Sequence, residues 1–165
     1  MRGPFAFLTV AVLVTVCSWA AKFSTIYKVG NDNKWEMSNF WNKRTFYVVP
    51  GTGQSECVAL FPGIFEGKVI TSDVVVTLHV ATWGDGAKPK ANTFSLFSDP
   101  ECKKPVPATQ SGTLPTSSTF VDLVYTVSKE DAAFTNDLAV KIKKLYSSSA
   151  QIRWESATIA FSYEN

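Results

Sequence analysis

Alternation of apolar and polar residues with a period of two is the feature of this sequence that most constrains its fold. Near the C-terminus Ile152 and Trp154 alternate with polar residues, and the segments 74–80 and 138–142 have the same period. A period of two places every second side chain on one face of a strand, whereas an amphipathic helix has a period of 3.6. The sequence therefore predicts β-strands as the main element.

Breaks rich in glycine and proline separate the strand-like runs, for example at Pro50–Gly53 and Gly84–Gly86. Short strands with such breaks predict an antiparallel sandwich or barrel. One short helix is expected at Lys129–Asp137, capped by Ser128. The expected strands are Phe23–Val29, Thr45–Val49, Val58–Phe61, Lys68–Trp83, Thr93–Ser98, Phe120–Ser128, Leu138–Ser147 and Gln151–Tyr163.

The first 20 residues have the order of a secretory signal peptide. Arg2 precedes an apolar run from Phe5 to Val16, and Ser18 and Ala20 occupy the −3 and −1 positions of a cleavage site before Ala21. The run is shorter than the ~20 residues that a membrane span requires. We therefore expect cleavage to leave residues 21–165 as one secreted, extracellular domain without a membrane span.

The charge of the chain is close to neutral. The formal net charge is +2, and loss of Arg2 with the signal peptide reduces it by one. Because no basic block is present, nucleic acid and anionic membranes are not expected partners.

The cysteines predict a disulfide. Cys17 leaves with the signal peptide, so Cys57 and Cys102 remain. An isolated pair in a secreted protein most simply forms one bridge, worth on the order of 4 kcal/mol by the chain-entropy estimate. The alternative, a reactive thiol, lacks an activating neighbour in the sequence.

The C-terminal run Ser149–Phe161 resembles the closing strand of galactose-binding-like β-jelly rolls, a group that includes carbohydrate-binding modules. Such domains often end with an aliphatic, an aromatic and an acidic residue before alternating apolar positions, here Ile152, Trp154, Glu155, Ala157 and Ile159. The resemblance covers the last 45 residues or so. It implies an all-β, antiparallel β-sandwich of jelly-roll type, and often binding of carbohydrate or a surface ligand.

Catalytic motifs are sparse. His79 is the sole histidine. A Ser-His-Asp triad would need it as the base, with Asp73 or Asp122 behind it, and no Gly-x-Ser-x-Gly elbow supplies a nucleophile. A pair of carboxylates for glycoside hydrolysis remains an alternative.

No cofactor is expected. Zinc requires clustered Cys and His, which one histidine and a disulfide do not provide. A structural calcium ion at Asp85, in the turn Gly84–Gly86, is the metal alternative left open, against a plain hairpin turn.

The segment Asn33–Arg44 has the composition of a sugar site. It combines aromatic rings with amides and charged groups, which suit the apolar face and the hydroxyls of a sugar ring. The alternative is that its tryptophans fill the end of the core. The candidate ligand-binding residues are Trp35, Glu36, Asn39, Trp41 and Asn42 from this segment, and His79, Trp83 and Asp85 from the long strand and its turn.

These observations favour a secreted, non-catalytic binding module for a glycan or a cell-surface ligand. Two other classes stay open: a secreted structural or host-interaction protein that acts through a protein interface, and a small glycoside-hydrolase-like enzyme. No feature of the sequence specifies the oligomeric state.

Overall fold

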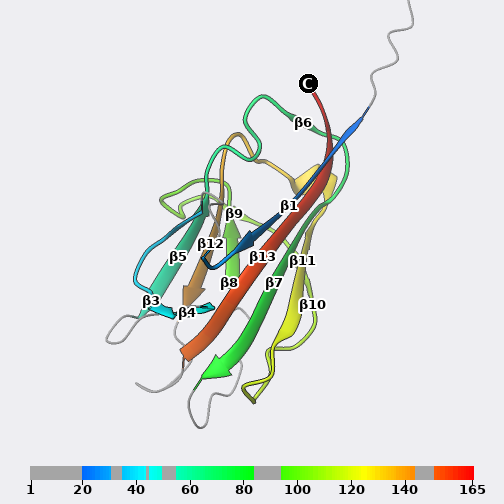
Figure 1. The fold of residues 1–165 in the computed structure, drawn as a ribbon. Coiled ribbons are helices and arrows are strands. Elements are labelled where there is room, and N and C mark those ends of the chain that lie inside the picture. The colour runs from blue at the N-terminus through cyan, green and yellow to red at the C-terminus, as the bar shows by residue number, and fades with distance from the viewer. Residues whose placement is uncertain (1–19, 31–34, 44, 50–54, 84–93, 144–150) are drawn as a thin grey trace, which may run out of the picture.

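A computed structural model describes residues 20–30, 35–43, 45–49, 55–83, 94–143 and 151–165. In these residues the chain forms two antiparallel β-sheets that face each other, as Figure 1 shows. The predicted all-β, two-sheet architecture is confirmed. Over the same residues no helix has the length and apolarity to cross a membrane. The predicted signal peptide lies outside the described residues and stays a prediction.

The larger sheet, sheet A, has eight strands in the described residues. Its main path runs β10-β11-β7-β13-β4-β3, and β1 and β6 also pair with β13. The strands are β1 (Ala21–Lys28), β3 (Trp41–Lys43), β4 (Phe46–Val49), β6 (Val69–Ile70), β7 (Val74–Trp83), β10 (Thr109–Ser111), β11 (Val121–Val127) and β13 (Gln151–Glu164).

Strand β13 organises sheet A because it is long enough to pair with several strands. Its 14 residues pair with β7 and then β6 along one side, and with β4 and then β1 along the other. Between Trp154 and Ser156 the register with β7 shifts, so Glu155 forms a β-bulge. A bulge turns a side chain away from the regular alternation.

Sheet B has five strands in the described residues, in the order β2-β5-β12-β8-β9. They are β2 (Glu36–Met37), β5 (Glu56–Phe61), β12 (Leu138–Lys143), β8 (Phe94–Phe97) and β9 (Pro105–Val106). β9 is an edge strand, which suits Pro105 because proline has no N–H for a second neighbour.

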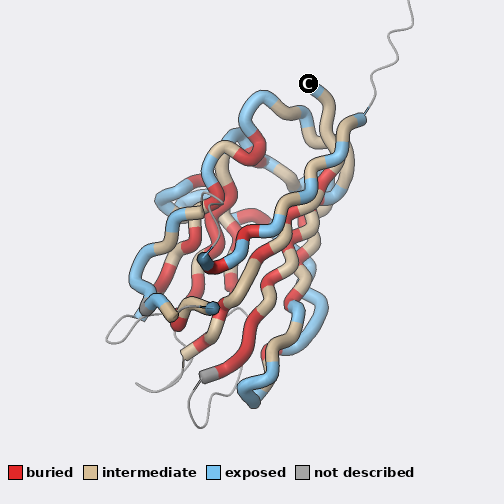
Figure 2. Tube along the Cα trace, in the orientation of Figure 1, coloured by how far each residue is buried: buried red, intermediate tan, exposed pale blue. Residues whose placement is uncertain are grey.

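The hydrophobic core lies between the two sheets. Figure 2 shows buried positions alternating with more exposed ones along the strands, as the period-two pattern predicts. Trp154 is fully buried in this core, as its register with Ile152 suggests. Phe61 and Phe65, also fully buried, come from β5 and the turn that follows it.

Several elements differ from the prediction. The long run Lys68–Trp83 is divided into β6 and β7, and the expected helix is only a 3-10 turn, Lys129–Asp131. Ser128 does cap it, since its Oγ accepts a hydrogen bond from the N–H of Asp131 at 3.3 Å. The short strands β2, β3, β9 and β10 were not predicted, because two or three residues are too few to display a period.

The predicted disulfide is not formed, because Cys57 and Cys102 are both free thiols. Cys57 alternates with the more exposed Glu56 and Val58 on β5, so it points into the core and is fully buried. Its Sγ donates to the carbonyl oxygen of Ser38 at 2.8 Å. Cys102 lies in the β8–β9 turn, where partial burial raises the pKa of its thiol and the nearby charges of Lys141, Asp99, Glu56 and Glu101 act on it. Two of these residues, Lys141 and Glu56, form an ion pair at 2.6 Å with side chains that are not buried. Cys102 therefore lies on the outer side of sheet B, whereas Cys57 lies on its inner side.

Thiol reactivity tests directly whether Cys57 and Cys102 are free. Burial raises the pKa of Cys57 to about 12, so in the folded protein it stays a neutral, unreactive thiol. We expect a thiol reagent without reductant to modify Cys102 slowly in the native protein, and both cysteines in denaturant. Absence of free thiols in denaturant would contradict this result and support the predicted disulfide.

Candidate functional site

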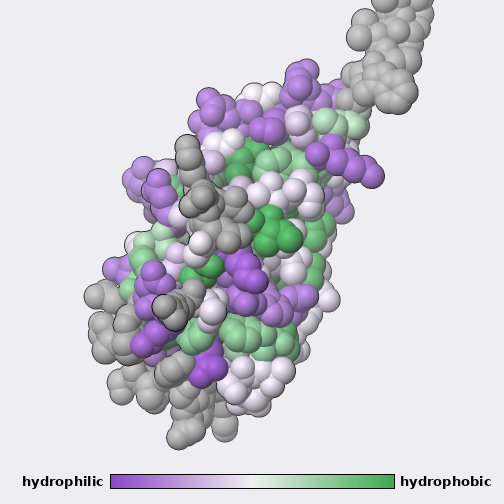
Figure 3. Space-filling view, viewed as in Figure 1, coloured by the Kyte–Doolittle hydropathy of each residue, from purple (hydrophilic) through white to green (hydrophobic). Residues whose placement is uncertain are grey.

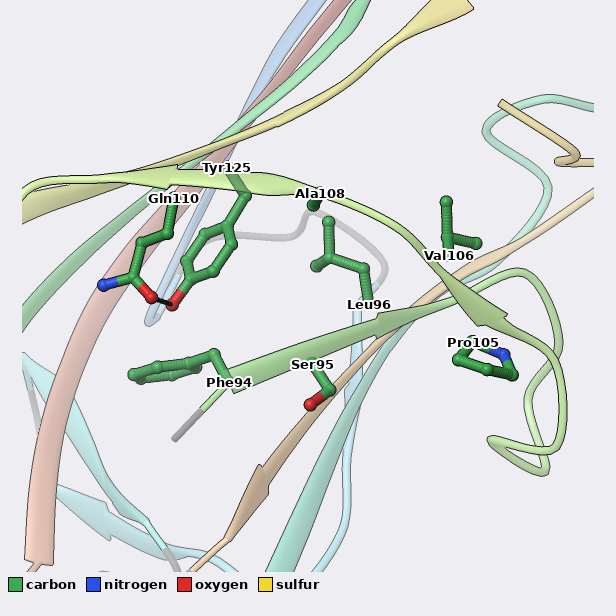
Figure 4. A pocket seen from close by; sticks show the side chains of 8 residues that line it. All are labelled: Phe94, Ser95, Leu96, Pro105, Val106, Ala108, Gln110 and Tyr125. Atoms are coloured by element: carbon green, nitrogen blue, oxygen red, sulfur yellow. Dashed lines mark hydrogen bonds between the residues drawn. The ribbon is translucent and has the colours of Figure 1, made fainter. Parts of the chain in front are cut away.

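A pocket of about 220 Å³ opens at the edge of the sandwich, between β8 and β9 of sheet B and β10 and β11 of sheet A. Here the chain crosses from the edge of one sheet to the edge of the other through residues 107–108. Figure 4 shows the lining residues, which are Phe94, Ser95, Leu96, Pro105, Val106, Ala108, Gln110 and Tyr125.

Strand alternation determines which side chains face the pocket. On β8, Phe94 and Leu96 are buried and project to the inner side, whereas the Ser95 side chain points the other way (Figure 4). Tyr125 projects inward from β11, and its ring centroid lies 6.3 Å from that of Phe94. The pocket therefore has two aromatic rings from different sheets.

One polar pair stands beside these rings. The Tyr125 hydroxyl donates to Gln110 Oε1 at 3.1 Å, drawn as a dashed line in Figure 4. Gln110 Nε2 in turn donates to the carbonyl oxygen of Gly112 at 3.3 Å. Burial raises the pKa of Tyr125, so its phenol keeps its proton. The donor of Tyr125 is thus occupied, while lone pairs on its oxygen and on Gln110 Oε1 can still accept hydrogen bonds.

Gly112 fixes the backbone next to this pair. Its φ is +87°, and a Cβ at this position would lie 2.6 Å from the carbonyl oxygen of Asp122. Only glycine fits such a close approach with a left-handed backbone. The turn between β10 and β11 therefore holds Gln110 over Tyr125.

A second cluster of chemically active groups lies on the outer face of sheet A. The Nδ1 of His79 on β7 is 2.6 Å from Asp122 Oδ1 on β11, and its Nε2 is 3.4 Å from Glu155 Oε2 on β13. Phe120 stacks on the imidazole with ring centroids 5.2 Å apart and planes 14° apart. We call His79, Asp122, Glu155 and Phe120 the His79 cluster.

The His79 cluster contains two of the three members of a catalytic triad, the histidine and the aspartate. Asp122, one of the two acids proposed from the sequence, contacts Nδ1 as a triad aspartate does, whereas Asp73 instead accepts a hydrogen bond from the N–H of Lys129 at 3.0 Å. The Nε2 side, where a nucleophile would stand, faces the carboxylate of Glu155. This arrangement does not activate a serine.

Trp35 packs against the core. Its ring lies 5.5 Å from Phe61, 5.3 Å from Trp154 and 5.4 Å from Tyr47, between ring centroids. It is only partly exposed, so three aromatic neighbours occupy much of its surface. Its role in ligand stacking stays a prediction, and this packing favours the core-filling alternative.

Glu36, Asn39 and Asn42 are not among the residues that line the pocket beside Tyr125, which we call the Tyr125 pocket. Asn39 and Asn42 are exposed near β3, and Asn39 has a positive φ of 53°. Glu36 lines a separate hollow of about 330 Å³ with Pro100 and neighbouring residues of β2 and β5. Asp85 and the side chains of Trp41 and Trp83 lie outside the described residues, so their roles also stay predictions.

Sequence reasoning missed the residues of the pocket. Tyr125 has the register of a core residue, and the sequence does not show that its hydroxyl ends at an opening. Gln110 lies in the Pro/Ser/Thr-rich stretch Pro105–Ser118, which has no periodicity. The one local signal in the sequence is a glutamine, Gln110, two residues before a glycine, Gly112, and this signal is weak.

Metal ligands are few in the part of the chain that the structure describes. That part contains no group of three or more His, Cys, Asp or Glu side chains arranged to hold a metal ion. The calcium alternative at Asp85 falls outside it and stays untested.

Substitution of Trp35 distinguishes packing from ligand contact. We expect Trp35→Ala to lower the free energy of unfolding by about 2–3 kcal/mol, somewhat less than for a fully buried tryptophan. Asn42→Ala, on an exposed position of the same segment, should change it by less than about 0.5 kcal/mol. Urea denaturation measures both, and a Trp35→Ala protein as stable as Asn42→Ala would contradict the packing role.

Comparison with known proteins does not place the chain in a family. No protein-family model matches the sequence, and no curated protein matches it significantly. The Tyr125 pocket and the His79 cluster are therefore interpreted from their own chemistry.

Proposed function

We propose that the protein is a secreted, non-catalytic binding module of galactose-binding-like, jelly-roll type, and that it binds a glycan through the Tyr125 pocket. One observation carries this proposal: the pocket combines the rings of Phe94 and Tyr125 with the hydrogen-bonded Tyr125–Gln110 pair. A sugar has an apolar C–H face and several hydroxyl donors. Both rings are 4 % exposed, so each offers the former only a small surface, and the lone pairs on the Tyr125 and Gln110 oxygens suit the latter.

The size of the pocket supports a small part of a glycan as the occupant. A cavity of about 150 Å³ accepts benzene. A pocket of about 220 Å³ that opens at the sandwich edge suits one sugar ring that remains partly in solvent. We therefore expect recognition of a terminal or branching residue more than of a long chain.

Binding through a protein interface is the second candidate. The observation that favours it is Ile26, which is 57 % exposed on β1. Figure 3 shows the face over β1, β13 and β7, where hydrophobic and hydrophilic side chains are interspersed. Because no continuous apolar area dominates this view, we rank it below the pocket.

A glycoside hydrolase is less well supported. Asp122 and Glu155 both contact the imidazole of His79, so two carboxylates do lie near each other. However, the side chain of Asp122 is 60 % exposed, whereas glycosidase acids flank a bound sugar in a shielded site.

A glycan array with the purified protein tests the proposal, followed by affinity measurements on the best ligand. Ala108→Trp should fill the pocket and weaken binding at least tenfold. Gln110→Ala should weaken it about three- to tenfold, as expected for one or two lost hydrogen bonds. The matched control Ala133→Trp adds the same ring at an exposed alanine near the 3-10 turn and should change nothing.

Three results would contradict the proposal. One is an array without any bound glycan. Another is a glycan that binds Ala108→Trp and the parent protein with equal affinity, since its site would then lie elsewhere. Loss of binding in both tryptophan variants would also count against the pocket, because the effect would not be local.

A further inference from the structure

The His79 cluster is independent of the Tyr125 pocket. On β11, Asp122 belongs to the exposed side, whereas Tyr125 belongs to the buried side. Asp122 is opposite His79 in the register, and His79 is opposite Ser156, next to the bulged Glu155. Sheet A therefore lies between the two sites, and an inference about one does not rest on the other.

The imidazole of His79 lies between two carboxylates, and a neutral imidazole can donate a hydrogen bond to only one of them. A neutral imidazole has one N–H, and its other nitrogen has a lone pair. In the tautomer whose Nδ1–H donates to Asp122 at 2.6 Å, the lone pair of Nε2 faces Glu155 Oε2 at 3.4 Å. A lone pair and a carboxylate oxygen repel each other at this distance. A cation held by both atoms, either a proton or a metal ion, removes this repulsion.

We propose that this cation is a divalent transition-metal ion of the Zn²⁺ class, bound by His79 Nε2 and Glu155 Oε2. Zinc binds imidazole nitrogen and carboxylate oxygen at about 2.0–2.2 Å, so two adjacent tetrahedral ligands are about 3.3–3.5 Å apart. The observed 3.4 Å agrees with this spacing. Imidazole and carboxylate are also the ligand types that Zn²⁺ accepts.

Asp122 acts as a positioning residue in this site. Metal-binding histidines usually donate their second ring N–H to a carboxylate, which fixes the tautomer and the ring orientation. Asp122 does this at Nδ1, and Phe120 restricts the ring from one face. The other oxygen of Glu155, Oε1, lies 3.9 Å from Lys28 Nζ, so Oε2 remains for the metal ion.

Two protein ligands define an open site. Since the described residues contain no set of three metal-ligating groups, the proposed site leaves the remaining positions to water. His79 is 36 % exposed in its side chain, which gives an ion access from solvent. The site is thus exchangeable and differs from a closed structural zinc site.

The sole histidine of the chain provides the readout. We would titrate the isotope-labelled protein with Zn²⁺ at pH 7.5 and follow the imidazole resonances by NMR. Cys102→Ser serves as the parent, because a partly exposed thiol also binds zinc. The expected result is a saturable, one-site shift of the His79 resonances.

Three further variants locate the ion. Glu155→Gln should weaken Zn²⁺ binding at least tenfold, and Asp122→Asn should weaken it 10- to 100-fold, as is usual for the partner of a metal-binding histidine. Glu130→Gln, which removes an exposed carboxylate from the 3-10 turn, should leave the affinity unchanged. Thermal melts verify that each variant is folded.

An imidazole that does not respond to Zn²⁺ would overturn the proposal, because a proton would then be the cation between Nε2 and Glu155. Unchanged affinity in Glu155→Gln or in Asp122→Asn would also overturn it, since the ion would not use the described geometry.

Discussion

The packing of Trp154 is the interaction on which both candidate sites depend. Its indole is fully buried between the sheets, with ring centroids 5.3 Å from Trp35 and 6.0 Å from Phe94. Its Nε1 donates to the carbonyl oxygen of Ser156 at 2.9 Å, across the bulge at Glu155. One side chain thus supports the wall of the pocket through Phe94 and the bulge that directs Glu155 toward His79.

Strand β11 contributes one residue to each of the two candidate sites. Its buried positions supply Tyr125 to the pocket, and its more exposed positions supply Asp122 to the His79 cluster. β11 pairs with β10 along one edge and with β7 along the other. Each site is therefore assembled from residues that are far apart in the sequence. Rigid strands are better than loops at holding such groups in place. The two sides of sheet A therefore carry two candidate sites of different chemistry.

Local periodicity explains what the sequence predicted well. The alternation in β7, β12 and β13 identified these strands, and the register of Trp154 with Ile152 placed it in the core. Asp122 was one of two acids, with Asp73, that a triad built on His79 would need, and the sequence did not choose between them. The pairing of His79 with Asp122 depends on the register of β7 with β11, which the sequence alone does not specify.

Contacts between distant segments explain what the sequence did not predict. Trp35 lies in a segment without periodicity, and its packing depends on Phe61 and Trp154 from both sheets. The disulfide prediction paired cysteines by compartment and number, whereas the sheet places one thiol inside and the other in a turn. Gln110 acquires its role only when β10 lies beside β11. Such contacts are properties of the assembled sandwich.

The most direct test of the central claim is an amide chemical-shift map of the labelled protein with the best glycan from the array. The account predicts the largest shifts at Leu96, Gln110 and Tyr125, around the pocket, with none at Lys28 or His79 on the opposite side of sheet A. Shifts confined to the outer face of sheet A, or to the segment around Trp35, would contradict it.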